Sequence, residues 1–135
     1  MARSFEFERR DFLRLPVALQ VRYKFLSRQI EHPELKRVHE GITRNLGAGG
    51  MQLSCNMPEA GWMAELLTRR MYVGINLMLP RADRPVKALC RCTWASALHG
   101  ETDQAVLGLE FQEITSEDRD LVTRYMIKAQ LEGSR

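Results

Sequence analysis

The sequence predicts a mainly β domain, a six-stranded antiparallel barrel that carries one helix at its C-terminus. Three observations support this prediction. Apolar and polar residues alternate with a period of two in short segments that are separated by turns. The C-terminal segment instead places its apolar residues at helical spacing. The chain of 135 residues, 44% of them hydrophobic and 27% charged, has the size and composition of an ordinary globular domain.

The alternation is clearest after Pro16, where every second residue from Val17 to Phe25 is apolar. A turn is expected at Ser27–Pro33, and a glycine-rich turn at Asn45–Gly50, between the second and third strands. We expect the six strands at residues 17–25, 35–44, 51–55, 72–79, 86–95 and 104–113.

The closing helix is expected at residues 116–131. Thr115-Ser116-Glu117-Asp118 supplies a capping residue followed by acidic residues, which favour the first turn of a helix. Between Pro58 and Arg70, apolar residues recur at helical spacing, so this segment forms either a short covering helix or a structured loop. No repeat or linker divides the chain. We therefore expect one domain over residues 1–135, with an N-terminal arm at 1–14, the barrel at 15–114 and then the helix.

The charge is unevenly distributed along the chain. The net charge is +3, and residues 1–44 carry ten Lys and Arg against six Asp and Glu. This excess indicates either a solvated basic face or a partner that bears phosphate. The N-terminus lacks the apolar core of a secretion signal, and no stretch is long enough to span a membrane. Three cysteines are an odd number, so we expect reduced thiols in a cytoplasmic protein.

The residues do not form a convincing catalytic or metal site. Cys90 and Cys92 fall in one predicted strand and point to the same face, and with Cys55 they still lack a fourth zinc ligand. The histidines at positions 32, 39 and 99 form no paired motif, and no phosphate-binding or dinucleotide-binding glycine motif is present. We therefore expect a binding module without a cofactor, and not an enzyme.

Two segments carry the residue types that recognition requires. Arg9, Arg10 and Arg14 precede the first strand, and arginine forms paired hydrogen bonds with guanine and with phosphate. Asn45, followed by Gly47 and Gly50, lies in the glycine-rich turn. An asparagine amide pairs with a base edge, and glycine permits positive φ and a close ligand approach. Taken separately, a solvated charge run and a plain hairpin loop explain the two segments equally well.

Together, the two segments resemble the motifs of the PilZ domain family, bacterial receptors for the second messenger cyclic di-GMP. The RxxxR motif of that family corresponds to Arg10 and Arg14, and its [D/N]xSxxG motif corresponds to Asn45, Gly47 and Gly50. The resemblance extends over residues 6–130. It includes the strand around Trp94, the segment Leu107-Gly108-Leu109-Glu110-Phe111 and the helix that starts at Ser116.

This resemblance implies a split six-stranded barrel and a receptor that binds cyclic di-GMP and signals through a protein partner. Arg10 and Arg14 would bind guanine edges and phosphates, Arg9 a phosphate and Asn45 a base, and the arm would become ordered around the ligand. Gly47 replaces the serine of the motif, so one hydroxyl contact is missing. One alternative is therefore an adaptor that has lost nucleotide binding and docks a protein through Trp62, Met63 and Leu66. A weaker alternative is nonspecific RNA binding by a small basic barrel.

Overall fold

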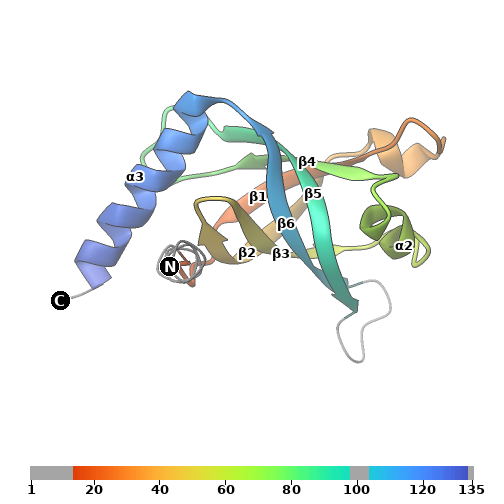
Figure 1. Ribbon diagram of the computed structural model, residues 1–135, viewed down its shortest axis with the longest axis horizontal. Helices are drawn as coiled ribbons and strands as arrows, with labels where there is room; N and C mark the ends of the chain where they lie inside the picture. Colours follow the sequence, from red (N-terminus) through yellow and green to blue (C-terminus); the bar gives the residue numbers. More distant parts are fainter. Residues whose placement is uncertain (1–13, 98–103, 134–135) are drawn as a thin grey trace, which may run out of the picture.

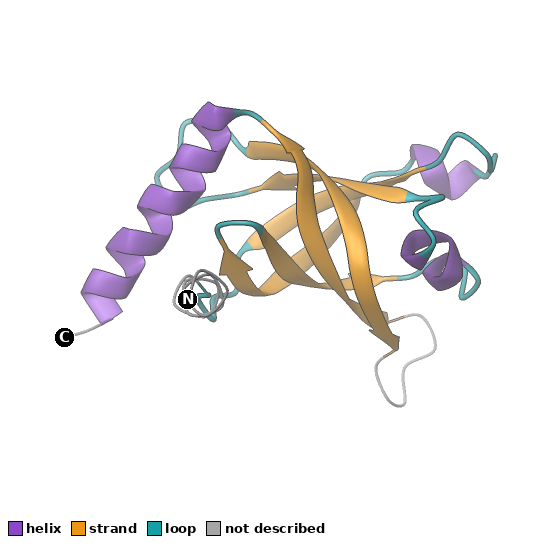
Figure 2. Ribbon diagram, in the orientation of Figure 1, coloured by secondary structure: helices purple, strands orange, loops and turns teal. Residues whose placement is uncertain are grey.

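The computed structural model describes residues 14–97 and 104–133. Its six strands form a closed antiparallel barrel in the order β1-β2-β3-β6-β5-β4, and α3 leans against one end of it (Figures 1 and 2). This architecture confirms the predicted fold class. The elements are β1 (Gln20–Leu26), η1 (Pro33–Lys36), β2 (His39–Gly47), β3 (Gly50–Asn56), α2 (Trp62–Leu67), β4 (Tyr72–Leu77), β5 (Val86–Ala97), β6 (Gln104–Ile114) and α3 (Ser116–Gly133).

The core fills the barrel with the alternate residues that the sequence pattern predicts. In β1, Val21, Tyr23 and Phe25 are buried, while Arg22 between them faces solvent. Burial of a large apolar side chain contributes about 1.5–3 kcal/mol, so such rows dominate the stability of the barrel. In the described part of the chain, no helix has the length and apolar composition needed to cross a bilayer.

The helix α2 closes the end of the barrel that lies away from α3 (Figure 1). It settles the open question about residues 58–70 in favour of a short helix. Trp62 and Leu66 are buried in the barrel core, where the indole packs edge to face on Phe25 with the ring centres 5.3 Å apart. The alternative docking surface built on Trp62, Met63 and Leu66 is therefore wrong, because two of its three side chains are already covered.

The first strand starts later than the alternation predicts, at Gln20 and not at Val17. The cause is the buried side chain of Thr43 in β2. Its hydroxyl accepts a hydrogen bond from the Leu19 amide at 2.8 Å and donates one to the Val17 carbonyl at 2.6 Å. The Thr43 side chain thus takes the place of part of the regular backbone ladder, beside the hydrogen bond from the Thr43 amide to the Leu19 carbonyl at 2.9 Å.

The second strand also starts later, at His39, because the expected strand over residues 35–44 begins with a 3₁₀ helix. Pro33 occupies the first turn of η1, where its missing N–H costs no hydrogen bond. Nδ1 of His32 accepts a hydrogen bond from the Glu34 amide at 3.1 Å and caps this turn. Local proline and histidine chemistry therefore overrides the weak strand signal of this segment.

The helix α3 is fixed to the barrel at its first turn. The Thr115 hydroxyl caps it by accepting from the Asp118 amide, and Val122 and Met126 of its apolar stripe are buried. The Asp118 carboxylate accepts from the Lys87 amide at 3.0 Å and pairs with Arg84. Burial alone would raise the pKa of Asp118, but these two partners lower it below the ordinary carboxyl value.

Candidate functional site

A groove of about 920 Å³ lies between α3, the β2–β3 hairpin and the start of the described chain. Figure 1 shows these three parts side by side at one end of the molecule. The groove collects four of the six predicted site residues, Arg14, Asn45, Gly47 and Gly50. Its volume is within the usual range for small-molecule sites. We call it the hairpin groove; its other lining residues include Gln52, Thr93, Trp94, Glu110 and Arg119.

Asn45 reaches the groove because β2 is irregular at this point. The pairing register of β2 with β3 shifts between Thr43 and Asn45, as in a β-bulge. Thr43 and Leu46 are both buried, so two residues separate them where a regular strand would have one. Asn45 thus lies in a strand and not in the predicted turn, and its partly exposed amide makes no hydrogen bond with another described residue.

Arg14 is held beside the same strand by its neighbour. Leu15 and Leu46 exchange two backbone hydrogen bonds of 2.8 Å each, which attach the incoming chain next to Asn45. The Arg14 side chain is exposed and forms no ion pair with the described residues. Its charge is therefore available to a ligand. Arg9 and Arg10 lie outside the described residues.

The structural reason for glycine in the hairpin differs from the one predicted. Gly47 and Gly50 form the last pair of the β2–β3 ladder, and neither Gly49 nor Gly50 has a positive φ. A Cβ on Gly50 would lie only 2.0 Å from the Leu109 carbonyl oxygen, so the packing of β3 on β6 requires glycine there. The prediction that the motif glycines provide positive φ is wrong for Gly50.

Trp94 provides an aromatic surface in the groove. A second register shift, between Cys92 and Trp94, displaces the pairing of β5 with β6 at this residue. The indole lies across Gly108, where a Cβ would come within 2.2 Å of Nε1. The Trp94 side chain is large, yet the residue stays 39% exposed. It has the position and exposure needed to stack on a planar ligand group.

Arg119, in the first turns of α3, adds a second cation to the groove. It is exposed and has no acidic partner among the described residues. The carboxylate that lines the groove, on Glu110, is 3.2 Å from Arg91 and so is partly neutralised. Arg119 was not predicted as a site residue from the sequence, and Trp94 was assigned no role there. The resemblance of the strand around Trp94 to the family could have pointed to Trp94. Arg119 becomes recognisable as a site residue only from the docking of α3.

The cysteines do not provide a second site. Cys55, Cys90 and Cys92 are buried and unpaired, as predicted. Burial raises the pKa of Cys55 and of Cys90 to about 12, and that of Cys92 to about 11. They are neutral thiols at physiological pH and poor nucleophiles. No group of three potential metal ligands occurs in residues 14–97 and 104–133.

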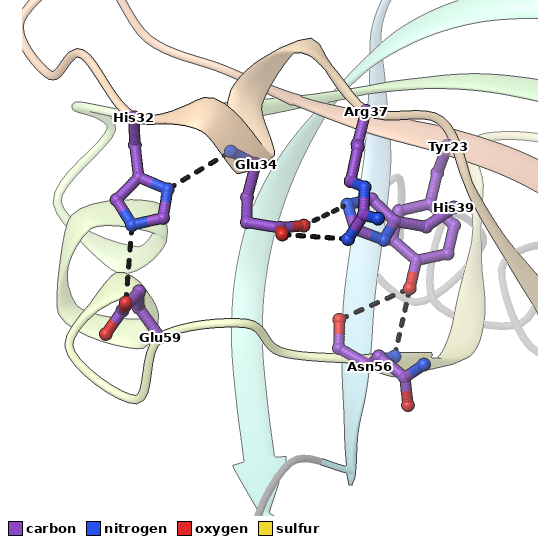
Figure 3. Close-up of polar contacts among 7 residues, drawn as sticks. All are labelled: Tyr23, His32, Glu34, Arg37, His39, Asn56 and Glu59. Carbon is purple, nitrogen blue, oxygen red and sulfur yellow. Dashed lines mark hydrogen bonds and ion pairs between the residues drawn. The ribbon is translucent and has the colours of Figure 1, made fainter.

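The histidines at positions 32 and 39 meet in one polar cluster at the end of the barrel that α2 covers (Figure 3). The pattern of the sequence gave no sign of this cluster. Nε2 of His32 lies 3.3 Å from Glu59, and Nε2 of His39 lies 3.7 Å from Glu34. Figure 3 also shows the Tyr23 hydroxyl bonded to the backbone of Asn56. These contacts join η1 to β2 and to the turn before α2, and they join β1 to β3, so the cluster has a structural role.

Comparison with known proteins agrees with the fold. The model of the PilZ domain family matches residues 8–128. No curated protein sequence matches the chain. Among solved structures, the Bacillus subtilis inhibitor of motility (MotI/DgrA) superposes with a TM-score of 0.66 at 18% identity, over 91% of this chain and 52% of its own. This chain therefore spans about half the length of MotI/DgrA.

Two further structures share the fold. PlzA of Borreliella burgdorferi, solved in complex with c-di-GMP, gives a TM-score of 0.56 at 12% identity over 98% of this chain and 57% of its own. The PilZ domain of CeSA from a cellulose-synthesising bacterium gives 0.52 at 14% identity over 87% and 97%. The family match covers most of the chain, and the barrel and the terminal helix agree with it. The chain belongs to the PilZ domain family.

Proposed function

We propose that this PilZ domain is a receptor for cyclic di-GMP, which binds in the hairpin groove and signals through a protein partner. The observation that carries the proposal is the convergence in one groove of Arg14, from the segment before β1, with Asn45 and Gly47 of β2. The family match and the c-di-GMP complex of PlzA support this class of ligand. No bond of the ligand is made or broken.

The groove offers each chemical group of a cyclic dinucleotide a suitable partner. Arg10 and Arg14 would bind guanine N7 and O6 edges and phosphate oxygens through paired N–H donors, and Arg9 would add a phosphate contact. Asn45 would pair with a base edge through its free amide. These roles need the exposed charge of Arg14 and the unpartnered amide of Asn45, and both are present.

Trp94 of β5 and Arg119 of α3 complete the proposed site. The exposed indole would stack on a guanine, and stacking of a base on an aromatic side chain contributes about 1–3 kcal/mol. The Arg119 guanidinium would contact a phosphate, because it lines the groove without an acidic partner of its own. Trp94 is on a barrel strand and Arg119 is on the helix that Asp118 fixes to the barrel, so both are in place before the ligand arrives.

The proposed mechanism is ordering of the N-terminal arm, residues 1–14, around the ligand. The bridge between Leu15 and Leu46 supports it, because it makes the arm begin at the rim of the groove. Limited proteolysis tests this step. We expect cleavage within residues 1–14 of the free protein and protection of the same bonds at saturating cyclic di-GMP. Equal cleavage rates with bound ligand would rule out the ordering mechanism.

A second candidate is an adaptor that belongs to the same family but does not bind the nucleotide. Gly47 favours it, because the missing serine hydroxyl removes a hydrogen bond worth about 0.5–1.5 kcal/mol. Calorimetric titration with cyclic di-GMP, GTP and a short RNA separates the candidates. Binding of cyclic di-GMP alone supports the receptor, binding of RNA alone would replace it with the nonspecific RNA protein, and no binding would leave the adaptor.

We also propose that the protein acts in a reducing compartment such as the cytoplasm. All three cysteines are unpaired thiols inside the barrel. Disulfides form readily in oxidising compartments, where an unpaired buried thiol is less common. Fractionation of cells that express the chain, with immunodetection, tests this placement.

A further inference from the structure

A second groove, of about 660 Å³, lies on the outer face of β1, β4 and β5, and no residue lines both it and the hairpin groove. Its floor follows from strand register. Lys24 of β1 is opposite Gly74 of β4, and Gly74 is opposite Leu89 of β5. The central position of this outward row has no side chain, so the surface is hollow there. We call it the β4 groove.

The walls of the β4 groove are apolar at positions where a barrel normally faces solvent with polar residues. Leu26 is 39% exposed and Val38 is 60% exposed, and both line the groove with Leu89 and Ile114. A Cβ on Gly74 would lie 3.2 Å from the Leu26 side chain, which therefore bends over the hollow. Single exposed apolar residues are common, but a contiguous set in one hollow marks an interaction surface.

The charges around the β4 groove are mostly positive. Three cationic residues line it, Arg22, Lys24 and Lys87, against the carboxylate of Glu113. Arg22 lies 3.8 Å from Glu40, but both side chains are more than half exposed, and such pairs are weak. Lys24 forms no ion pair with the described residues. The groove therefore complements a partner that carries negative charge.

The shape of the groove distinguishes between two acidic partners, a protein and a nucleic acid. Single-stranded nucleic acids bind through aromatic side chains on which the bases stack. The aromatic residue that lines this groove, Tyr23, is 1% exposed and faces the barrel interior. The apolar wall instead suits aliphatic or aromatic side chains of a peptide, and the basic rim suits its carboxylates.

We propose that the β4 groove docks an acidic segment of a protein partner. Apolar side chains of the segment occupy the hollow over Gly74, and its Asp and Glu residues face Lys24 and Lys87. The inference goes beyond nucleotide binding and does not depend on it, because the two grooves share no residue. It assigns the output of the domain to a face that stays open when the hairpin groove is filled.

A displayed library of random twelve-residue peptides provides the probe. Peptides selected on the wild-type protein are synthesised with a fluorescent label, and their affinity is measured by anisotropy. We expect selected peptides to be enriched in Asp, Glu and large apolar residues. They should shift the backbone amide signals of Leu26, Gly74 and Leu89 in NMR spectra of the protein.

Two substitutions separate charge from shape. Lys24→Glu should lower the affinity for these peptides about 10-fold, because it places a like charge against the peptide carboxylates. Gly74→Ala should weaken them roughly 3-fold by filling the floor, since the atom that a new Cβ meets is the movable tip of Leu26. Lys128→Glu is the matched control, because it makes the same charge change at an exposed position of α3. It should leave the affinity unchanged.

Several results would overturn the proposal. The selection could recover no binder, or peptides that are not enriched in acidic residues. The selected peptides could also bind wild type and Lys24→Glu with equal affinity, or shift only amide signals on another face of the protein. A short RNA that shifts the same amides more strongly than the peptides would show a nucleic-acid surface instead. Titration of Lys24→Glu with cyclic di-GMP keeps the two proposals apart, because this variant should retain its affinity for the nucleotide.

Discussion

Asp118→Ala should detach the first turn of α3 from the barrel. The Asp118 residue is 3% exposed, and its carboxylate holds the Lys87 amide at 3.0 Å. A hydrogen bond to a charged group contributes about 1.5–3 kcal/mol. The ion pair with Arg84 adds less than about 1 kcal/mol, because half of the Arg84 side chain is exposed. We therefore expect the free energy of unfolding to fall by about 2–4 kcal/mol.

Urea and thermal unfolding, followed by circular dichroism, measure this loss. For a domain of this size, the change corresponds to a decrease in Tm of roughly 6–15 °C. Glu117→Ala is the matched control. It removes the adjacent carboxylate, which is 86% exposed and 4.0 Å from the same Arg84, and should cost less than about 0.5 kcal/mol.

The pH dependence gives an independent check. The pKa of Asp118 is lower in the folded protein than in the unfolded chain, so the folded state favours the ionised form. Its stabilising contribution is complete above the ordinary carboxyl pKa of about 4 and is lost as the pH falls through the lower folded value. The difference in stability between wild type and Asp118→Ala should be constant from neutral to mildly acidic pH and then shrink. A difference that persists unchanged in strong acid, or an equal loss in Glu117→Ala, would refute the argument.

Three further predictions concern the hairpin groove and the core. Arg14→Ala should weaken cyclic di-GMP at least about 10-fold in calorimetry with an unchanged Tm, whereas Arg28→Ala, exposed after β1, should bind like wild type. If Arg14→Ala keeps full affinity, the arm does not clamp the ligand. Gly47→Ser should strengthen binding roughly 3- to 10-fold by restoring a hydroxyl, and weaker binding by the folded variant would mean that the backbone requires glycine. The buried cysteines should react with a thiol reagent only after urea unfolds the protein; prompt reaction of the native protein would contradict their burial. They are Cys55, Cys90 and Cys92.

The strands were predictable where local patterning decides the structure. The alternation from Val21 to Phe25 in β1, and the apolar stripe of α3 with Val122 and Met126, both follow from residues close in sequence. These patterns specify which face of each element is buried, and hence a closed sheet with a helix against it. The resemblance to the family then identified which residues form the predicted site.

The predicted element boundaries were wrong where a residue that is distant in sequence determines the local structure. The start of β1 depends on the Thr43 hydroxyl, which is separated from Leu19 by 24 positions. The position of Asn45 depends on a bulge that only the pairing of β2 with β3 creates. Arg119 belongs to the groove because α3 docks on the barrel, through the buried Val122 and Met126 and through Asp118. Each of these facts requires a tertiary contact that no window of sequence contains.

The first turn of α3 connects the two proposed surfaces. Asp118 holds the backbone of Lys87, which lines the β4 groove, while its neighbour Arg119 lines the hairpin groove. A nucleotide that attracts Arg119 therefore acts on the same helical turn that fixes Lys87. Coupling between two binding sites is reciprocal, so cyclic di-GMP must change peptide affinity by the same factor as the peptide changes nucleotide affinity. Asp118 connects the helical turn of Arg119 to Lys87. We therefore expect that, in Asp118→Ala, each ligand still binds but changes the affinity for the other by a factor close to one.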